Sequence, residues 1–216
     1  MARLRVGVLI SGRGTNLQAL IDASADPAAP AEVALVISSQ GDAQGLARAR
    51  AAGIRSEIIN YRAFNAKQGF EASLDAALRG GRIDLVCLAG FMRILTPWFV
   101  ERWRDRLINI HPSLLPAFKG LDTHARVLDS GARFSGCTVH FVRAEMDEGP
   151  IIVQAVAPVM PGDTPDTLAA RVLGLEHRCY PLAVHLIAEG RVRVQNERVE
   201  ILNATVANAI MINPLG

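Results

Sequence analysis

Short apolar runs alternate with amphipathic segments along the first half of the chain. The apolar runs are typical of buried parallel strands, and the segments between them have the spacing of helices that cover a sheet. The predicted strands are residues 4–10, 32–38, 54–60, 82–90 and 106–110, and the predicted helices are residues 16–24, 42–53, 63–81 and 96–103. This alternation indicates an α/β fold, an open and mostly parallel twisted sheet with helices on both faces.

The pattern changes in the second half of the chain. Residues 134–142 and 150–159 predict two strands joined by a glycine-containing loop, which favours an antiparallel portion. A long helix over residues 164–190 and a closing hairpin over residues 191–201 follow. Since neither a linker nor a repeat interrupts the pattern, we expect a single domain over residues 1–216.

Composition and charge narrow the class of protein. The chain is 50% hydrophobic and 20% charged over 216 residues, which suits one domain with a full core. Its net charge of +2 is unclustered, and acids interleave the three arginines of ERWRDRL, so we expect a solvated surface there and no nucleic-acid partner. No stretch reaches the roughly 20 apolar residues of a membrane span, so we expect no membrane partner either.

The cysteines and the N-terminus bear on the compartment. The three cysteines are scattered without a CxxC spacing, which predicts neither a disulfide framework nor a zinc site. The apolar run near the N-terminus is too short for a signal peptide. The simplest expectation is a reduced, cytoplasmic location.

A glycine-containing loop, Ser11-Gly12-Arg13-Gly14-Thr15-Asn16, follows the first strand and opens the first helix. Backbone amides at a helix N-terminus bind anions, and Thr15 and Asn16 add side-chain donors. The third glycine of a dinucleotide fingerprint is replaced by Leu17, and no acid ends the second strand, so a single phosphate is the better ligand. The alternative is a tight turn whose glycines serve only steric needs.

The strand at residues 106–110 runs into Asn109 and His111, which lie on one side of an extended segment because side chains alternate. An amide beside an imidazole could polarise a carbonyl and stabilise an oxyanion. A carboxylate would orient the imidazole, and Asp147 is our candidate; the rival acids are Asp122, Asp129 and Glu148. Taken alone, a histidine such as His111 is more often structural.

The other histidines show no metal spacing, and no metal is expected. For His140 and His185, ordinary packing is the default interpretation. His177 stands beside Glu176 in a predicted helix, and this pair is either a solvated face or a ligand contact.

The segment Phe91-Met92-Arg93-Ile94-Leu95 follows the fourth predicted strand. Apolar side chains with one arginine suit a flat heteroaromatic ligand that carries acid groups. An ordinary strand-to-helix connection would also contain these residue types.

Together, LISGRGTNLQALID, DLVCLAGFMRIL, INIHPSLLPAFKGLDTH and GCTVHFVRAEMDEGPIIVQ closely resemble the phosphoribosylglycinamide formyltransferases. The resemblance covers roughly residues 4–195. It implies a Rossmann-like fold and direct formyl transfer from 10-formyltetrahydrofolate, as co-substrate, to the primary amine of glycinamide ribonucleotide in purine synthesis. It also implies a phosphate-binding half of about residues 1–105, a folate and catalytic half of about 106–200, and a tail over 201–216 that matches nothing.

The resemblance also implies roles for individual residues. The catalytic trio would be Asn109, His111 and Asp147, with Asn109 also at the folate. The remaining residues match family positions for binding substrate: Gly14, Thr15, Asn16 and Glu176 for the ribonucleotide, and Lys67, Met92, Arg93, Ile94 and Leu95 for the folate. Partners would be these small molecules, with the protein a monomer or a homodimer.

Two departures and three alternatives remain. Relatives often carry glycine at the position of Glu148, and some relatives carry a polar residue at the position of Leu173. Methionyl-tRNA formyltransferase normally has a further C-terminal domain, and formyltetrahydrofolate deformylase a further N-terminal one. A non-catalytic ribonucleotide or folate sensor is the third alternative, but the intact trio argues against it.

Overall fold

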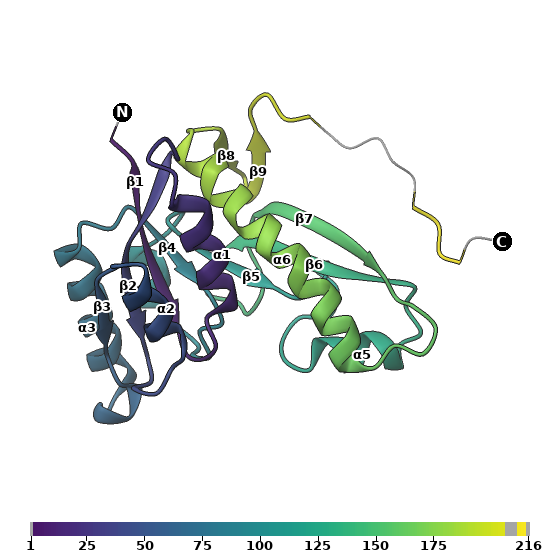
Figure 1. The fold of residues 1–216 in the computed structure, drawn as a ribbon, viewed down its shortest axis with the longest axis horizontal. Coiled ribbons are helices and arrows are strands. Elements are labelled where there is room, and N and C mark those ends of the chain that lie inside the picture. Colours follow the sequence, from purple (N-terminus) through teal and green to yellow (C-terminus); the bar gives the residue numbers. More distant parts are fainter. Residues whose placement is uncertain (1, 206–210, 215–216) are drawn as a thin grey trace.

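The computed structural model describes residues 2–205 and 211–214. It contains a seven-stranded sheet with the order β3-β2-β1-β4-β5-β6-β7 (Figure 1). The strands are β1 (Leu4–Ile10), β2 (Ala31–Ser38), β3 (Ser56–Ile58), β4 (Leu85–Leu88), β5 (Leu107–His111), β6 (Phe134–Phe141) and β7 (Ile151–Pro158). The first five are parallel, whereas β6 and β7 are antiparallel to their neighbours, as the sequence predicts.

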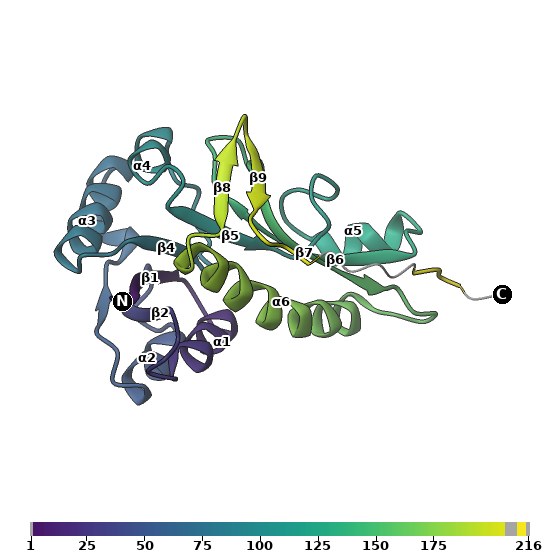
Figure 2. The same ribbon diagram turned by 90° about the horizontal axis from the view of Figure 1, so that it is seen from above.

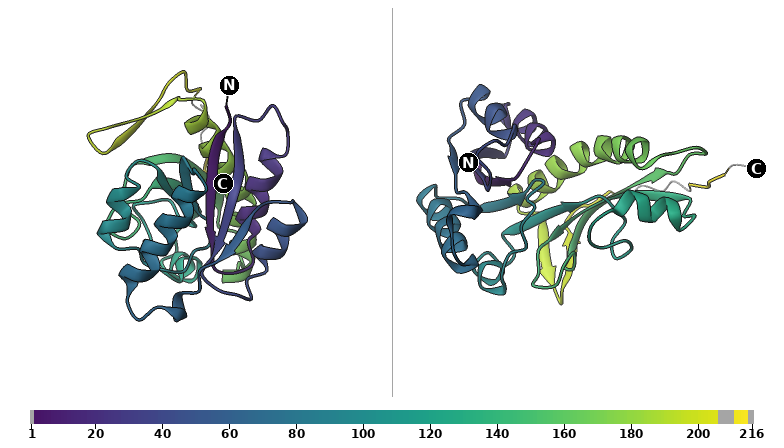
Figure 3. Two further views of the ribbon diagram at one scale, coloured as in Figure 1. Left: turned by 90° about the vertical axis from the view of Figure 1, so that its left-hand side faces the viewer. Right: turned by 90° about the horizontal axis from the view of Figure 1, so that it is seen from below.

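The helices lie on both faces of the sheet (Figure 3). They are α1 (Thr15–Ser24), α2 (Gly45–Ala51), α3 (Lys67–Gly80), α4 (Pro97–Arg102), α5 (Thr123–Asp129) and α6 (Pro165–Ala188), with a 3₁₀ turn at Tyr61–Ala63. In β1, Val8 and Ile10 face the core beneath α1 and α6, while Leu9 faces the core beneath α3 and α4. Successive side chains of a strand point to opposite faces, and helices bury both faces here. Strand positions on both faces are therefore buried, which explains the unbroken apolar runs.

A separate two-stranded sheet, β8 (Val192–Gln195) and β9 (Arg198–Ile201), forms the predicted C-terminal hairpin. Figure 2 shows it rising from the main sheet between α4 and α5. The residues that follow it include Asn213, whose amide donates to the carbonyls of Arg133 and Val159 at 2.7 and 3.0 Å.

The predicted strands at 54–60 and 82–90 are shorter in the structure, two predicted helices begin too early, and one helix was missed. The predicted helix at 63–81 begins only at Lys67, because Asn60 caps a 3₁₀ turn and the chain is extended at Phe64 and Ala66. The predicted helix at 42–53 begins at Gly45. The missed helix α5 has only 7 residues, too few to show a clear apolar periodicity.

Candidate active site

The carboxyl ends of β1, β4 and β5 lie side by side in the sheet, as their pairing requires. Ser11 joins the loops that follow β1 and β4: its hydroxyl accepts from the Met92 amide at 2.9 Å, and its own amide donates to the Gly90 carbonyl at 3.2 Å. The Ser39 hydroxyl after β2 lies 2.8 Å from that of Ser11. The loops that carry the predicted phosphate and folate residues are therefore held together at one edge, where open α/β sheets bind ligands.

Gly14 has a steric reason to be glycine. Its φ of 70° lies in the left-handed region, and a Cβ there would stand 2.6 Å from the Gly45 Cα. The Gly45 amide also donates to the Gly12 carbonyl at 3.1 Å. The steric interpretation thus holds for Gly14 but not for Gly12, where a Cβ would meet nothing within 4 Å. It is compatible with anion binding, because the close approach at Gly14 brings the first turns of α1 and α2 together.

The N-terminus of α1 has amides available for an anion. Gly14 is its N-cap and supplies no side-chain cap; the first hydrogen bond of the helix runs from the Gln18 amide to the Gly14 carbonyl at 3.0 Å. The amides of Thr15, Asn16 and Leu17 therefore have no partner within the helix. Together with the helix dipole they suit a phosphate.

Asn16 does not point its side-chain amide at the loop. Its Nδ2 donates to Glu176 Oε2 of α6 at 2.7 Å, and both side chains are buried. Burial raises the pKa of the Glu176 carboxyl, and the hydrogen bond from Asn16 only partly offsets this. Asn16 Oδ1 is buried without a partner among the described residues, which leaves an acceptor for a ligand hydroxyl or amine.

His111 and Asp147 come together. Asp147 Oδ2 lies 3.4 Å from His111 Nδ1 and accepts from the Gly120 amide at 2.7 Å. His111 Nε2 lies 2.9 Å from the Phe118 carbonyl, which can only accept, so this nitrogen carries a hydrogen. An imidazole protonated on both nitrogens satisfies both contacts. Of the candidate acids, Asp147 is thus the one that orients His111.

Asn109 faces His140, which sequence reasoning had assigned to ordinary packing. His140 Nδ1 lies 2.9 Å from the Phe141 carbonyl and carries the hydrogen, so Nε2 accepts from Asn109 Nδ2 at 3.4 Å. Burial lowers the pKa of His140, which keeps the ring neutral. This contact orients the Asn109 amide, and the second hydrogen of Nδ2 has no acceptor among the residues that the structure describes. Strand pairing of Asn109 with His140 could be found only once β6 was placed beside β5.

His124 is a second histidine near the site that the sequence did not indicate. It lies in α5, and its pKa is lowered by burial and, secondarily, by the charge of His111. Its Nδ1 is buried and, within residues 2–205 and 211–214, has no hydrogen-bond partner. The sequence did not indicate that His124 lies near the site, because α5 itself was not predicted.

The predicted folate residues follow β4 as an apolar ledge. Met92 and Ile94 expose about two thirds of their surface, at 67% and 64%, whereas Leu95 is buried. The Arg93 guanidinium stacks 4.3 Å from the centroid of the Tyr61 ring. Exposed apolar side chains beside a cation suit a flat acidic ligand. Lys67 is exposed at the first turn of α3.

Glu148, where relatives often carry glycine, makes an ion pair. Its Oε1 lies 2.5 Å from Lys119 Nζ. The pair joins the loop of Asp147 to the loop after β5, next to the hydrogen bond between Gly120 and Asp147. Both side chains are partly exposed, so we assign the pair little stability.

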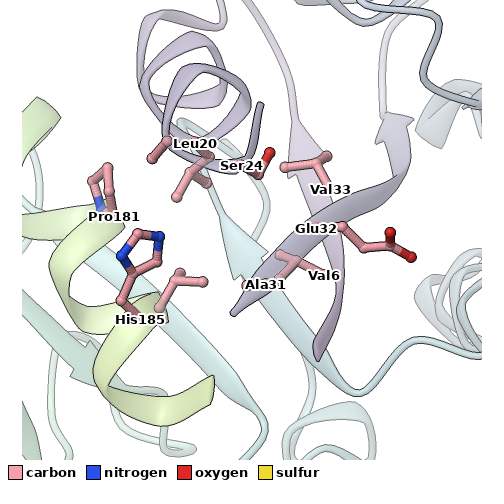
Figure 4. Close-up of a pocket in the computed structure, with 10 residues that line it drawn as sticks. Val6, Leu20, Ser24, Ala31, Glu32, Val33, Pro181 and His185 are labelled. Carbon is pink, nitrogen blue, oxygen red and sulfur yellow. The ribbon is translucent and has the colours of Figure 1, made fainter. Parts of the chain in front are cut away.

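A cavity of about 10 Å³ elsewhere in the molecule is not part of this site. It lies between β1, β2, α1 and α6, and Figure 4 shows Val6, Ala31 and His185 around it. Val6 and Ala31 belong to the amino-terminal halves of β1 and β2, and His185 lies near the end of α6, so the cavity is away from Ser11. Among the described residues, neither a cluster of three metal-ligating side chains nor a helix able to cross a membrane is found.

The fold and the site define an α/β protein whose candidate site lies at the carboxyl edge of its sheet. A family model described as formyl transferase matches residues 4–184. The chain belongs to this formyl transferase family.

Known proteins are similar in sequence to this one over most of its length. The phosphoribosylglycinamide formyltransferase of Escherichia coli is 45% identical over 191 residues, 88% of this chain and 90% of the relative. The trifunctional purine biosynthetic protein adenosine-3 of Gallus gallus is 47% identical over 192 residues, 89% of this chain but 19% of the relative. This chain thus spans about a fifth of such trifunctional relatives. The crystal structure of glycinamide ribonucleotide transformylase 1 from Symbiobacterium toebii superposes with a TM-score of 0.91 at 48% identity, covering 93% of this chain and 95% of that one.

Proposed function

We propose that the protein transfers the formyl group of 10-formyltetrahydrofolate to the primary amine of glycinamide ribonucleotide, giving N-formylglycinamide ribonucleotide and tetrahydrofolate in purine biosynthesis. The observation that carries the proposal is the contact between His111 and Asp147 beside Asn109, on the sheet edge that also carries the uncapped N-terminus of α1. Transfer of a formyl group to a phosphorylated amine needs an acid–base group at the reacting carbonyl and a binding site for the phosphate.

The ribonucleotide binds with its phosphate on the amides of Gly14, Thr15 and Asn16. Glu176 and Asn16 form a buried polar pair beside this loop, and the free Asn16 Oδ1 suits a hydroxyl of the sugar. The folate binds along Met92, Ile94 and Leu95, with Arg93 and Lys67 as cations for its acid groups. Holding both substrates in line supplies much of the rate enhancement.

In the reaction, the amine nitrogen attacks the formyl carbon, and the carbonyl oxygen becomes an oxyanion. The free hydrogen of Asn109 Nδ2 and the hydrogen of His111 Nε2 stabilise this charge. The bond from the formyl carbon to N10 then breaks, the former amine loses a proton, and N10 gains one. Asp147 holds His111 in place and takes part in this proton transfer through water.

His111 reaches the oxyanion only after the Phe118 carbonyl gives up its hydrogen bond. Phe118 has a φ of 55°, in the left-handed region that a bulky side chain adopts at a cost. We therefore expect the loop after β5 to shift when substrates bind, which releases Nε2.

The testing experiment follows the absorbance change as 10-formyltetrahydrofolate loses its formyl group. We expect turnover with glycinamide ribonucleotide and none without it. Turnover without the amine would instead identify a deformylase, and formylation of methionyl-tRNA alone would identify a transfer-RNA enzyme. Binding of both ligands without turnover would indicate a sensor. Mass measurement in solution decides between monomer and homodimer, and a cytoplasmic location remains our prediction.

Glu176→Gln is expected to raise stability at neutral pH and weaken ribonucleotide binding. Because burial raises the pKa of Glu176 in the folded state, the folded protein binds this proton more tightly than the unfolded chain does. Stability is therefore lost as pH rises from the ordinary glutamate pKa of about 4.3 through the raised value. Glutamine avoids that loss and still accepts from Asn16.

The measurement is the melting temperature of both proteins between about pH 4 and pH 8. The variant should melt higher at the upper end and at the same temperature at the lower end, while its KM for the ribonucleotide rises. Glu200→Gln on the exposed face of β9 is the control and should change neither quantity. A variant that melts lower at neutral pH would contradict the prediction.

A further inference from the structure

The loop between β6 and β7 holds Asp147 in a demanding conformation. Asp147 has a φ of 52°, in the left-handed region. Its carboxylate must still reach both the Gly120 amide and His111. A strained residue keeps such a position only when its surroundings hold it there. The question is which groups hold this loop.

Arg143 touches both ends of the loop. It is the second residue after β6, and its side chain is only 8% exposed. A Cβ on Gly149, at the other end, would lie 3.1 Å from Arg143 Cγ and 2.1 Å from the Phe141 carbonyl oxygen. The stem of Arg143 thus lies under Gly149, and both ends of the loop depend on where this side chain sits.

The Arg143 guanidinium is fixed by three acceptors. Nη1 donates to the Val142 carbonyl at 3.1 Å, Nη2 to Asp105 at 2.7 Å and Nε to Glu197 at 2.5 Å. A guanidinium this buried needs acid partners, because an unpaired buried charge is strongly unfavourable. Asp105 precedes β5, but Glu197 comes from the C-terminal hairpin, 54 residues further along the chain.

Glu197 lies in the turn between β8 and β9, where it and Asn196 both have positive φ. One carboxylate oxygen accepts from Arg143, and the other accepts from Arg104 at 2.5 Å. The hydrogen bond from Arg143 lowers the pKa of Glu197, so the bridge stays charged at neutral pH. Glu197 therefore connects the base of the Asp147 loop to the segment after α4.

The ion pairs that Glu197 forms with Arg143 and Arg104 lie in an open cleft. A cleft of about 510 Å³ is lined by Arg143, Glu145 and Glu148 from the loop, Glu101 and Arg104 from the α4 region, and Glu197 from the hairpin. Because the cleft is open, apolar packing does not fill the gap between hairpin and loop there. The ion pairs of Glu197 cross it.

We propose that Glu197 is a positioning residue for Asp147: it fixes Arg143 at the base of the loop and so keeps the Asp147 carboxylate against His111. The inference rests on the proposed function, since it assigns the hairpin a part in the same formyl transfer. The hairpin, which lies outside the seven-stranded sheet, is then part of the catalytic architecture.

The first test compares Glu197→Ala, Glu197→Gln and the control Glu200→Ala in the full chain. We expect kcat to fall about tenfold in Glu197→Ala, with both KM values within about twofold. The substitution lies away from the substrates and displaces Asp147, which orients His111 and does not hold a substrate. Glu197→Gln keeps one acceptor oxygen for an arginine, without the charge, and kcat should fall less than in Glu197→Ala. Glu200→Ala should match the wild type. An unchanged kcat in Glu197→Ala overturns the inference.

The second test is a double-mutant cycle with Asp147→Asn. If Glu197 acts through Asp147, Glu197→Ala should cause no further loss of kcat in the Asp147→Asn protein; losses that multiply overturn the inference. Should that background be too slow to measure, amide hydrogen exchange decides: the Gly120 amide should exchange faster in Glu197→Ala, and unchanged exchange overturns the inference. A wild type without amine-dependent turnover would overturn the proposed function instead, and exchange at Gly120 would still report on the bridge.

Discussion

Replacing His111 by alanine is expected to lower kcat by about 10²-fold or more, the range of a positioned acid–base group. His111 is buried, and its two nitrogens face Asp147 and the Phe118 carbonyl, so its orientation is fixed before the substrates bind. Alanine removes a donor to the oxyanion while the phosphate loop and the folate ledge stay intact. The loss should therefore appear in kcat, with the KM for glycinamide ribonucleotide within about threefold.

His185→Ala is the matched control, because this histidine lies on α6 beside the small cavity away from the site. It should keep the kcat of the wild type. Steady-state rates with both substrates varied, together with circular dichroism to check folding, make the comparison. A His111→Ala protein that is folded and within threefold of the wild type would sink the assignment of His111.

Replacing Trp103 by alanine is expected to lower the free energy of unfolding by about 3–5 kcal/mol, the usual cost of removing a large buried aromatic side chain. Trp103 is 1% exposed and packs on Phe99 in the core beneath α3 and α4. Its Nε1 also donates to Asp75 at 3.1 Å, so alanine leaves both a cavity and a buried carboxylate with one donor fewer.

Trp98→Ala offers the control within the same helix region. Trp98 is 45% exposed, and its ring lies 5.0 Å from the Arg102 guanidinium, so its loss should change stability by less than about 1 kcal/mol. Urea unfolding followed by circular dichroism measures both. Equal losses in the free energy of unfolding for the two variants would contradict the prediction that the buried Trp103 contributes more to stability than the exposed Trp98.

The three arginines of ERWRDRL show how far a local interpretation extends. Interleaved acids predicted a solvated surface, and the structure gives each arginine a defined partner. Arg102 pairs with Asp75, Arg104 bridges Glu101 and Glu197, and Arg106 stacks on Trp103. All three side chains are exposed, as predicted, and Glu101 and Trp103 lie within the same segment, but Asp75 and Glu197 are distant in sequence, so no window around the arginines contains them.

The sequence by itself determined the sheet and its helices, because the alternation of apolar runs with amphipathic segments follows from which faces are buried. It also determined the family, since the motifs around Ser11, Gly90 and His111 stand in order along the chain. Element boundaries at α2 and α3 and the short α5 escaped, because capping and 3₁₀ turns depend on single contacts rather than on periodicity.

Only the tertiary structure chose among the candidate acids and paired distant polar groups. Asp147 rather than Asp122, Asp129 or Glu148 meets His111. The loop between β6 and β7 leaves the sheet beside the start of β5, where Phe141 pairs with Ile108, and folds back so that Asp147 contacts His111 and Gly120. Asn16 and Glu176 lie 160 residues apart, yet they pair because α1 and α6 pack on the same face. The periodic pattern of buried positions depends on residues that are close together in the sequence, whereas contacts between loops depend on strand order and register.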